Sequence, residues 1–162
     1  MGMDNTKTKN EPSGKKGGSS VSRTCRDQAL VYLSLRDHNR RELALKLRTK
    51  SYSSDEIEGT LDELEDEGLL SEARYVRSFV RSNNRRHPEG KATVFQRLAA
   101  KGADRETSRQ VLDEIYTDEY TVSLVVQARS QILKKGKACK EEEIRFELKK
   151  LGFSNNDVAK CE

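Results

Sequence analysis

Apolar residues recur at helical spacing along most of the chain. Pairs four positions apart, such as Leu43 with Leu47 and Tyr75 with Phe79, place apolar side chains on one face of a helix. No stretch shows sustained alternation of apolar and polar residues, and the hairpin dipeptides Asn-Gly and Asp-Gly are absent from the sequence. The pattern therefore predicts an all-α chain.

An internal repeat organises these helices. Stretches that begin at Leu43, Val94 and Ile144 lie 51 and 50 residues apart, and each has an apolar pair at i and i+4, a turn position and a helix N-cap. The turn position is occupied by Ser51, Gly102 and Gly152, and the N-cap by Ser53, Asp104 and Ser154. Glycine readily adopts the left-handed conformation that ends a helix, whereas a serine in that conformation costs about 1 kcal/mol. Each repeat is expected to form two helices, a tight turn and a third helix.

The repeat predicts a tail and three compact units that form an elongated, curved array. Residues 1–22 are rich in Lys, Asn, Ser, Thr and Gly and are expected to be a flexible tail. Helix-turn-helix-like units of three helices each then cover 23–70, 71–116 and 117–162. The predicted helices are 23–37, 40–50, 54–67, 71–86, 90–101, 105–115, 118–135, 140–151 and 155–161.

Composition excludes several classes of protein. Hydrophobic residues make up 33% and charged residues 36% of the 162 residues, which is little for one thick core but enough for three small ones. No run approaches the roughly 20 apolar residues of a membrane span and no secretory leader is evident, so we expect a cytoplasmic protein. Cys25, Cys139 and Cys161 lack disulfide or zinc spacing, and His38 and His87 are expected on the surface. Without a phosphate loop, metal signature or nucleophile–base motif, neither a cofactor nor catalysis is expected.

The net charge of +4 conceals an uneven distribution. The 8 bases and 3 acids of 23–50 give +5, the eight acids of 51–70 give −8, and 74–101 carries eight bases against Glu89 alone. The candidate binding residues are the bases of the last stretch and three from the first, namely Arg74, Arg77, Arg81, Arg85, Arg86, Lys91, Arg97, Lys101, Arg40, Arg41 and Arg48. Such a surface fits an anionic partner, either nucleic-acid phosphate or an acidic protein surface. The alternative is a solvated helix face, which is what charge runs usually are.

The predicted third helix of the first unit argues against sequence-specific DNA reading. The recognition helix of a helix-turn-helix protein enters the major groove. Residues 54–67 carry eight acids and no base, so phosphates would repel that helix. It is expected to be a solvated acidic helix or a docking face for a basic partner. Tyr75 and Phe79 are expected in the core, so the sequence does not support a stacking platform for single-stranded bases.

Two segments resemble bacterial RecX regulatory proteins. Ala29–Leu43 together with Leu47–Tyr52 is similar to the opening signature of that family, and Ile57–Tyr75 is similar to the segment that follows. The resemblance extends from Arg23 to the C-terminus. The departures from the family pattern are Ser51 where glycine is usual, Asn39 where serine is usual, and the stretch 87–91.

The resemblance implies a function. Members of this family are tandem three-helix repeats that bind the RecA recombinase filament on single-stranded DNA, lie in its groove and touch neighbouring protomers. They inhibit its ATP hydrolysis, strand exchange and co-protease activity. The chain would then be a monomeric, non-enzymatic regulator of DNA repair, recombination and the SOS response, with weak direct DNA binding. The alternatives are a stand-alone DNA-binding architectural protein that uses 74–101, and a helical-repeat adaptor that uses 54–67.

Overall fold

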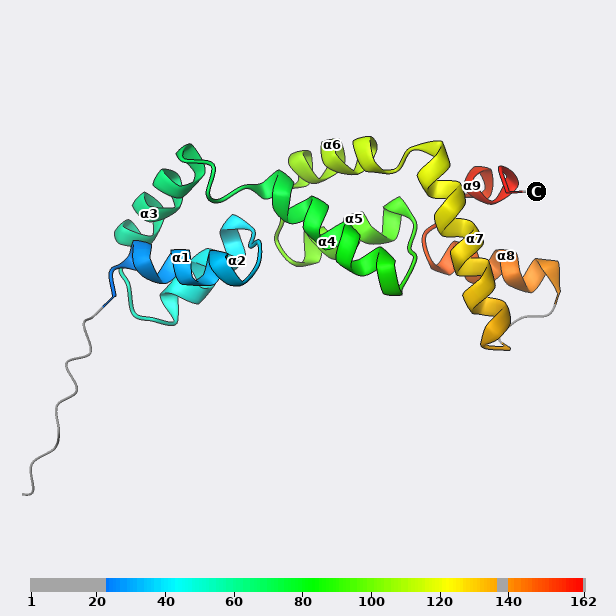
Figure 1. The fold of residues 1–162 in the computed structure, drawn as a ribbon, viewed down its shortest axis with the longest axis horizontal. Helices are drawn as coiled ribbons and strands as arrows, with labels where there is room; N and C mark the ends of the chain where they lie inside the picture. Colours follow the sequence, from blue (N-terminus) through cyan, green and yellow to red (C-terminus); the bar gives the residue numbers. More distant parts are fainter. Residues whose placement is uncertain (1–22, 137–139, 162) are drawn as a thin grey trace, which may run out of the picture.

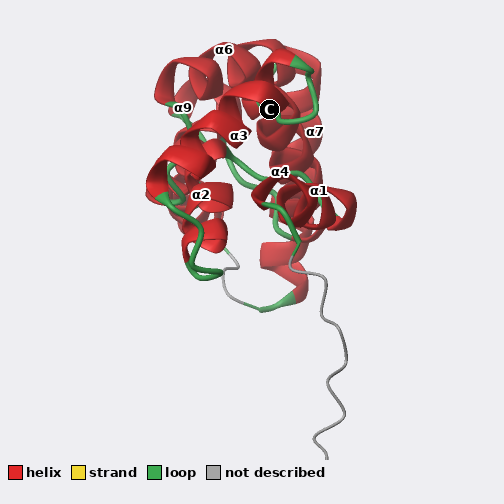
Figure 2. Cartoon of the chain, turned by 90° about the vertical axis from the view of Figure 1, so that its left-hand side faces the viewer, coloured by secondary structure: helices red, strands yellow, loops and turns green. Residues whose placement is uncertain are grey.

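The prediction of an all-α fold is confirmed. The computed structural model describes residues 23–136 and 140–161, and these contain nine helices and no strand (Figure 2). The helices are α1 (Cys25–Leu35), α2 (Arg40–Arg48), α3 (Ser54–Asp66), α4 (Glu72–Arg86), α5 (Lys91–Ala100), α6 (Arg105–Ile115), α7 (Asp118–Lys134), α8 (Glu141–Lys150) and α9 (Asn155–Ala159). In these described ranges no helix is long and apolar enough to cross a membrane. The predicted tail 1–22 and Cys139 lie outside the described residues.

The helices form three groups of three that follow one another along the long axis of the molecule (Figure 1). Each group has its own hydrophobic core, centred on the apolar pairs that the repeat predicted. These pairs are Leu43 with Leu47, Val94 with Leu98, and Ile144 with Leu148. The tandem architecture of three-helix units is thus confirmed. Tyr116 packs against both the second and the third core, and the unit limits at 70 and 116 stay predictions.

Hydrogen-bonded caps begin the third helix of each unit. The side chains of Ser53, Asp104 and Ser154 each accept a hydrogen bond from the backbone N–H three residues later, as their N-cap positions predicted. The turn before each cap is left-handed, with φ of 65° at Ser51, 78° at Gly102 and 89° at Gly152. The local signals in the sequence therefore encode the same turn three times.

Successive units meet at a joint that the chain builds twice. The N-cap residue of the second helix in one unit donates a hydrogen bond to the C-cap carbonyl of the second helix in the next unit. At the first joint, Nδ2 of Asn39 donates to the carbonyl of Lys101 over 3.2 Å. At the second joint, the backbone N–H of Gly90 donates to the carbonyl of Leu151, with 2.8 Å between nitrogen and oxygen. The residues that form the two joints therefore lie 51 or 50 positions apart, as the repeats do.

Close approach at the joints explains the turn glycines. A Cβ on Gly152 would lie 2.3 Å from Oγ1 of Thr93, and a Cβ on Gly102 would lie 2.4 Å from Cδ of Arg41. In the described part of the chain no unit precedes the first, and Ser51 is exposed. Serine at that turn carries only the cost of its positive φ, whereas at the other two turns a side chain would also collide with the adjoining unit.

One sequence prediction about the histidines is wrong. His38 is buried, with 2% of its surface exposed, whereas His87 is exposed as predicted. The ring of His38 lies 6.3 Å from the ring of Tyr32, and its Nδ1 lies 2.9 Å from the carbonyl oxygen of Arg36. Burial lowers the pKa of His38. The polar neighbours of His38 in the sequence suggested a surface, but its loop folds back against α1.

Candidate anion-binding surface

Helix α4 displays the predicted arginine stripe. Its inner face buries Tyr75, Val76 and Val80 in the second core, and this leaves Arg74, Arg77, Arg81, Arg85 and Arg86 exposed. The burial of Tyr75 also agrees with its predicted place in the core. The helical period therefore puts all five guanidinium groups at the surface.

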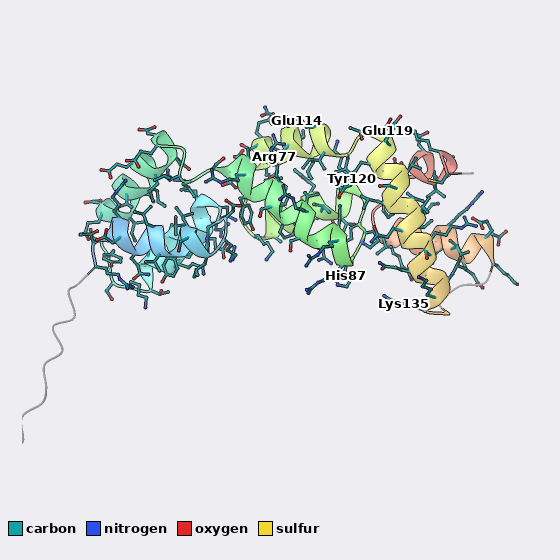
Figure 3. The ribbon with its side chains drawn as sticks, in the orientation of Figure 1. Arg77, His87, Glu114, Glu119, Tyr120 and Lys135 are labelled. Atoms are coloured by element: carbon teal, nitrogen blue, oxygen red, sulfur yellow. The ribbon has the colours of Figure 1, made fainter. Side chains whose placement is uncertain are left out.

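Acidic partners bind the first half of this stripe. Nε of Arg74 lies 2.8 Å from Oδ1 of Asp37, and the other guanidinium nitrogens of Arg74 donate to the carbonyls of Gly68 and Leu69. Arg77 pairs with Glu114 of α6 at 2.7 Å. Figure 3 shows the Arg77–Glu114 pair at the upper edge of the array. Both guanidinium groups therefore already have partners within the chain.

The second half of the stripe is open. Arg81, Arg85 and Arg86 are exposed, and within the described residues their side chains make no hydrogen bond and no ion pair. They lie on the last turns of α4, where positive charge also stabilises the negative end of the helix dipole. Three neighbouring guanidinium groups without acidic partners produce a local positive potential that attracts anions.

The predicted bases of α5 are engaged within the second unit. Lys91 forms an ion pair with Asp113 of α6. Arg97 lies 2.8 Å from Glu89, whose side chain is only 5% exposed. The ammonium of Lys101 lies 5.9 Å from the centroid of the Phe79 ring. Of the eight candidates in 74–101, the structure thus leaves Arg81, Arg85 and Arg86 as the group that has no internal partner among the described residues.

The candidates in the first unit have different surroundings. Arg40 donates to Glu58, Asp62 and Glu65 of α3 over 2.6 to 2.7 Å, and these bonds raise its pKa although burial opposes the rise. Arg41 packs against Gly102 at the first joint, and Arg48 is exposed. The Arg40 cluster repeats one unit later, since Lys91 and Asp113 lie 51 residues after Arg40 and Asp62.

Internal ion pairs compensate much of the acidic helix α3. Arg40 binds three of its carboxylates, and Arg26 of α1 binds two more, Glu63 at 3.5 Å and Glu67 at 2.7 Å. The +5 of residues 23–50 and the −8 of residues 51–70 therefore meet inside the first unit. This arrangement weakens the interpretation of 54–67 as a docking face.

The third unit adds lysines beside the open arginines, and the sequence alone did not indicate this. Nε2 of Gln131 on α7 donates to the carbonyl of Arg86 over 3.4 Å. A cavity of about 110 Å³ between the turn after α4 and helices α7 and α8 is lined by residues that include His87, Lys135 and the ion pair of Lys150 with Glu147. Figure 3 shows His87 and Lys135 together at the lower edge, where α4 and α7 end. The net charge of 117–162 concealed these lysines because acids elsewhere in that unit, such as those that begin α8, cancel them.

We name this surface the basic edge. It consists of Arg81, Arg85, Arg86, His87 and Lys135. A buried polar cluster supports it from below, because Nδ2 of Asn84 donates to the hydroxyls of Tyr116 and Tyr120 over 2.8 and 3.2 Å. The hydroxyl of Tyr116 in turn donates to the carbonyl of Glu89 over 2.9 Å, and burial raises the pKa of Tyr116. The basic edge is therefore fixed across two units and is suited to holding phosphate or carboxylate groups by charge.

Comparison with known proteins decides the family. A family model described as RecX, first three-helix domain, matches residues 25–64, which correspond to α1 and α2 and most of α3. A regulatory protein RecX from Leptothrix cholodnii is 42% identical over 92 residues, which cover 57% of this chain and 57% of that protein. Another, from Halorhodospira halophila, is 36% identical over 111 residues, which cover 68% of this chain and 65% of that protein. This chain belongs to the RecX family.

Solved RecX structures share the fold along most of the chain. The crystal structure of RecX from Lactobacillus salivarius superposes with a TM-score of 0.72 at 26% identity, over 85% of this chain and 91% of that one. A second RecX crystal structure, with a TM-score of 0.71 at 20% identity, shows the same fold. The chain spans 57% of the length of the Leptothrix relative and 65% of the Halorhodospira relative, which is less than two thirds of either.

Proposed function

We propose that this chain is a non-enzymatic regulator that binds in the groove of the RecA filament on single-stranded DNA. Bound there, it inhibits the ATPase, strand-exchange and co-protease activities of the filament, and in this way it modulates DNA repair and recombination in the cytoplasm. Membership of the RecX family, whose relatives are regulatory proteins by name, supports a regulatory role. The chain is proposed to act as a monomer and to use no cofactor.

The observation that carries the proposal is the basic edge on an elongated array. The edge spans the second and third units, because His87 and Lys135 line the same cavity and lie at the same edge of the molecule (Figure 3). A filament groove is itself a long surface, and in this filament it contains nucleic-acid phosphates. Unpaired guanidinium and ammonium groups on one edge complement such a groove.

The joints explain how binding would become inhibition. Both joints hold neighbouring units together by direct hydrogen bonds, so the array can act as a strap across a longer partner. If such a strap contacts two neighbouring filament subunits, its binding stabilises the arrangement of those two subunits to which it binds best. Subunit movements that accompany ATP hydrolysis or strand exchange are then disfavoured by the binding free energy. This mechanism requires no catalytic group on the chain.

ATP hydrolysis by the recombinase on single-stranded DNA tests the proposal. Wild-type protein should slow hydrolysis at substoichiometric levels. The Arg81→Glu/Arg85→Glu/Arg86→Glu variant should need at least about tenfold more protein for half inhibition, because each reversed charge turns an attraction into a repulsion. The Arg23→Glu/Lys50→Glu/Arg105→Glu variant reverses three exposed cations outside the basic edge and is the matched control. Undiminished inhibition by a correctly folded basic-edge variant would contradict the proposal.

The basic edge also favours a second candidate, a stand-alone DNA-binding architectural protein. This candidate requires bare DNA to bind as tightly as the filament does, with an affinity that falls steeply with salt. Measuring both affinities at several salt concentrations separates the two functions. The third candidate, an adaptor that docks through α3, is disfavoured because Arg40 and Arg26 already bind four of its carboxylates and that of its C-cap, Glu67.

A further inference from the structure

The buried imidazole of His38 has one nitrogen without a hydrogen bond. Its Nδ1 lies 2.9 Å from the carbonyl oxygen of Arg36, so Nδ1 carries the proton and donates, and Nε2 keeps its lone pair. Nε2 is buried and makes no hydrogen bond among the described residues. A buried polar atom without a partner destabilises the fold. The one group here that changes its charge near neutral pH therefore sits where neither of its protonation states is fully satisfied.

The surroundings of His38 oppose a second proton on the ring. Oε1 of Glu42 lies 4.0 Å from Nε2, which is too far for a hydrogen bond. Both oxygens of Glu42 already accept from the guanidinium of Arg36. The ring of Tyr32 lies between 5 and 7 Å from both His38 and the ammonium of Lys46, with centroid distances of 6.3 and 5.1 Å. An imidazolium would thus add a buried cation near two others, beside a carboxylate that is already bound.

Helix α4 adds no free carboxylate to this site. Its Tyr75 lines a cavity together with Arg36 and Glu42, and the other charged residues of that cavity are Asp37 and Lys101. The carboxylate of Asp37 is bound by Arg74. The charged and titratable groups around His38 are therefore Tyr32, Arg36, Asp37, Glu42, Lys46, Tyr75 and Lys101.

The two residues next to His38 connect the first unit to the second. Oδ1 of Asp37 accepts a hydrogen bond from Nε of Arg74 on α4 over 2.8 Å, and Nδ2 of Asn39 donates to the carbonyl of Lys101 over 3.2 Å. Figure 1 shows the loop between α1 and α2 on the side of the first unit that faces the second. A displacement of the His38 ring therefore moves both contacts of the first joint.

The second joint has a different group at the matching position. Glu89 lies 51 positions after His38, directly before Gly90, and it is also buried. Its carboxylate, however, has partners, since it lies 2.8 Å from the guanidinium of Arg97 and 2.9 Å from Nδ2 of Asn83. The two joints therefore differ in whether the buried titratable group beside them is satisfied.

We propose that His38 is a pH-sensitive switch that opens the first joint in mild acid. While the imidazole is neutral, its loop stays packed and the first unit is held against the second. When Nε2 takes up a proton, the imidazolium leaves its buried site for water, and the contacts of Asp37 and Asn39 are lost with it. The second joint stays closed. The switch goes beyond the proposed function and does not depend on which partner the array binds.

The direction of the switch follows from linkage. Burial lowers the pKa of His38 in the closed joint, although the hydrogen bond to the Arg36 carbonyl and the charge of Glu42 oppose this. In the open joint the solvated imidazole has its ordinary pKa of about 6.5. His38 therefore stabilises the closed joint fully above that value, and this contribution is lost as the pH falls through the closed-state pKa. At about pH 5.5, one unit lower, the ratio of open to closed joints rises by up to about tenfold.

Amide hydrogen exchange of the full chain, followed by NMR, tests the switch at two matched positions. The N–H of Leu43 donates to the carbonyl of the N-cap Asn39 over 3.0 Å. The N–H of Val94, 51 positions later, donates to the carbonyl of the N-cap Gly90 over 3.2 Å. Each amide becomes exposed when the loop before its helix leaves its joint. The ratio of the two exchange rates removes the pH dependence of exchange that all amides share.

The backbone N–H of Arg40 is the direct reporter of the joint, because it donates to Glu72 of the second unit over 3.3 Å. Glu72 titrates as well, but it is present in every protein compared, so differences between the proteins report the histidines. His38→Gln keeps a polar side chain and removes the titration. His87→Gln is the matched control, since His87 is the other histidine of the chain and is exposed.

We expect the Leu43-to-Val94 ratio of wild type and of His87→Gln to rise by up to about tenfold between about pH 7.5 and about pH 5.5. In His38→Gln the ratio should stay within about twofold, and the exchange of the Arg40 amide should follow the Leu43 amide in each protein. A ratio that is flat in wild type, or that rises equally in His38→Gln, would overturn the switch.

An NMR titration of the wild-type imidazoles needs no substitution and gives a second measure. His38 should carry its proton on Nδ1 and take up the second proton only below the ordinary pKa of about 6.5. A His38 ring that titrates at or above this value would also overturn the switch, because the proton would then stabilise the closed joint through Glu42. The inhibition assay with the recombinase tests the proposed function separately.

Discussion

At the joint between the first and second units, side chains make the contacts, whereas at the joint between the second and third units backbone meets backbone. Asn39 reaches Lys101 through its amide group, and Glu72 bridges the N–H groups of Arg40 and Asp104. At the second joint the backbone of Gly90 lies directly on the turn of the third unit.

The difference shows how one repeat produces two kinds of connection. Long side chains adjust to small displacements by changing rotamer, so the first joint tolerates change. Two backbones in contact have no such freedom, so the second joint depends on the absence of a side chain at Gly90 and Gly152. The basic edge spans the second joint, which therefore fixes the spacing of its cations.

The largest expected effect comes from Gly90→Ala. A Cβ at this position would lie 2.1 Å from the carbonyl oxygen of Gly152, and neither backbone can move aside. We expect the free energy of unfolding to fall by about 3 kcal/mol, at the upper end of overpacking costs. Urea unfolding of the full chain measures this.

Gly59→Ala is the control for that variant. No atom lies within 4 Å of the Cβ position of Gly59, which is on the exposed side of α3. This variant should gain about 0.5 to 1 kcal/mol, since alanine suits a helix interior better than glycine. If Gly90→Ala left the stability unchanged, the backbone contact would not be what holds the second joint.

A smaller loss is expected from Gly102→Ala at the first joint. The new Cβ would meet Cδ of Arg41 at 2.4 Å, and this flexible side chain can move. The loss should be about 1 to 2 kcal/mol, mainly from the positive φ. Adding Arg41→Ala should recover the steric part alone, which a double-mutant cycle in urea isolates.

Ser51→Gly measures the cost of the positive φ by itself. Ser51 has the same left-handed φ as Gly102, but no unit adjoins it in the described chain. This substitution should raise the free energy of unfolding by up to about 1 kcal/mol.

The Gly102→Ala experiment has its own contradicting outcome. If Gly102→Ala lowered the free energy of unfolding equally in the presence and in the absence of the Arg41 side chain, the joint would add no steric constraint at Gly102.

The smallest expected effect is a pH dependence at Glu72. Burial raises the pKa of Glu72, although hydrogen bonds from the N–H groups of Asp104 and Arg40 oppose the rise. Because the folded state then binds the proton more tightly, Glu72 stabilises the fold below its unfolded-state pKa and loses this contribution as the pH rises through its folded-state pKa.

Glutamine does not titrate, so the stability of Glu72→Gln relative to wild type should rise between about pH 4 and about pH 7. Urea titrations of both proteins at each pH measure it, and a relative stability that is flat or falls over this range would contradict the role of burial.

Much of the fold was predictable because its signals are local. The apolar pairs, the N-caps and the left-handed turns each depend on residues within a few positions of one another. The candidate site was predictable only in part. Helical period correctly placed the α4 arginines at the surface, but it could not distinguish Arg74 and Arg77, which have acidic partners, from Arg81 and Arg85.

The residues whose environment the sequence did not reveal are those whose surroundings come from distant parts of the chain. Arg40 is neutralised by carboxylates 18 to 25 positions away, and Gln131 reaches a carbonyl 45 positions away. His38 is buried although its neighbours in the sequence are polar. Net charge counted along the chain cannot reveal such pairs, because Coulomb interactions depend on distance in space.

The all-α class, the three-fold repeat and the start of each third helix follow from residue order alone, since hydrogen bonds within a turn and helical spacing set them. Which cations remain open, how the joints are built and which histidine is buried follow only from packing. These features depend on surfaces of different units that meet at van der Waals distance, and a periodic sequence places the same residue type in different surroundings at each repeat. Ser51, Gly102 and Gly152 illustrate this, because the same turn is free at one end of the array and pressed against a neighbour at the other two positions.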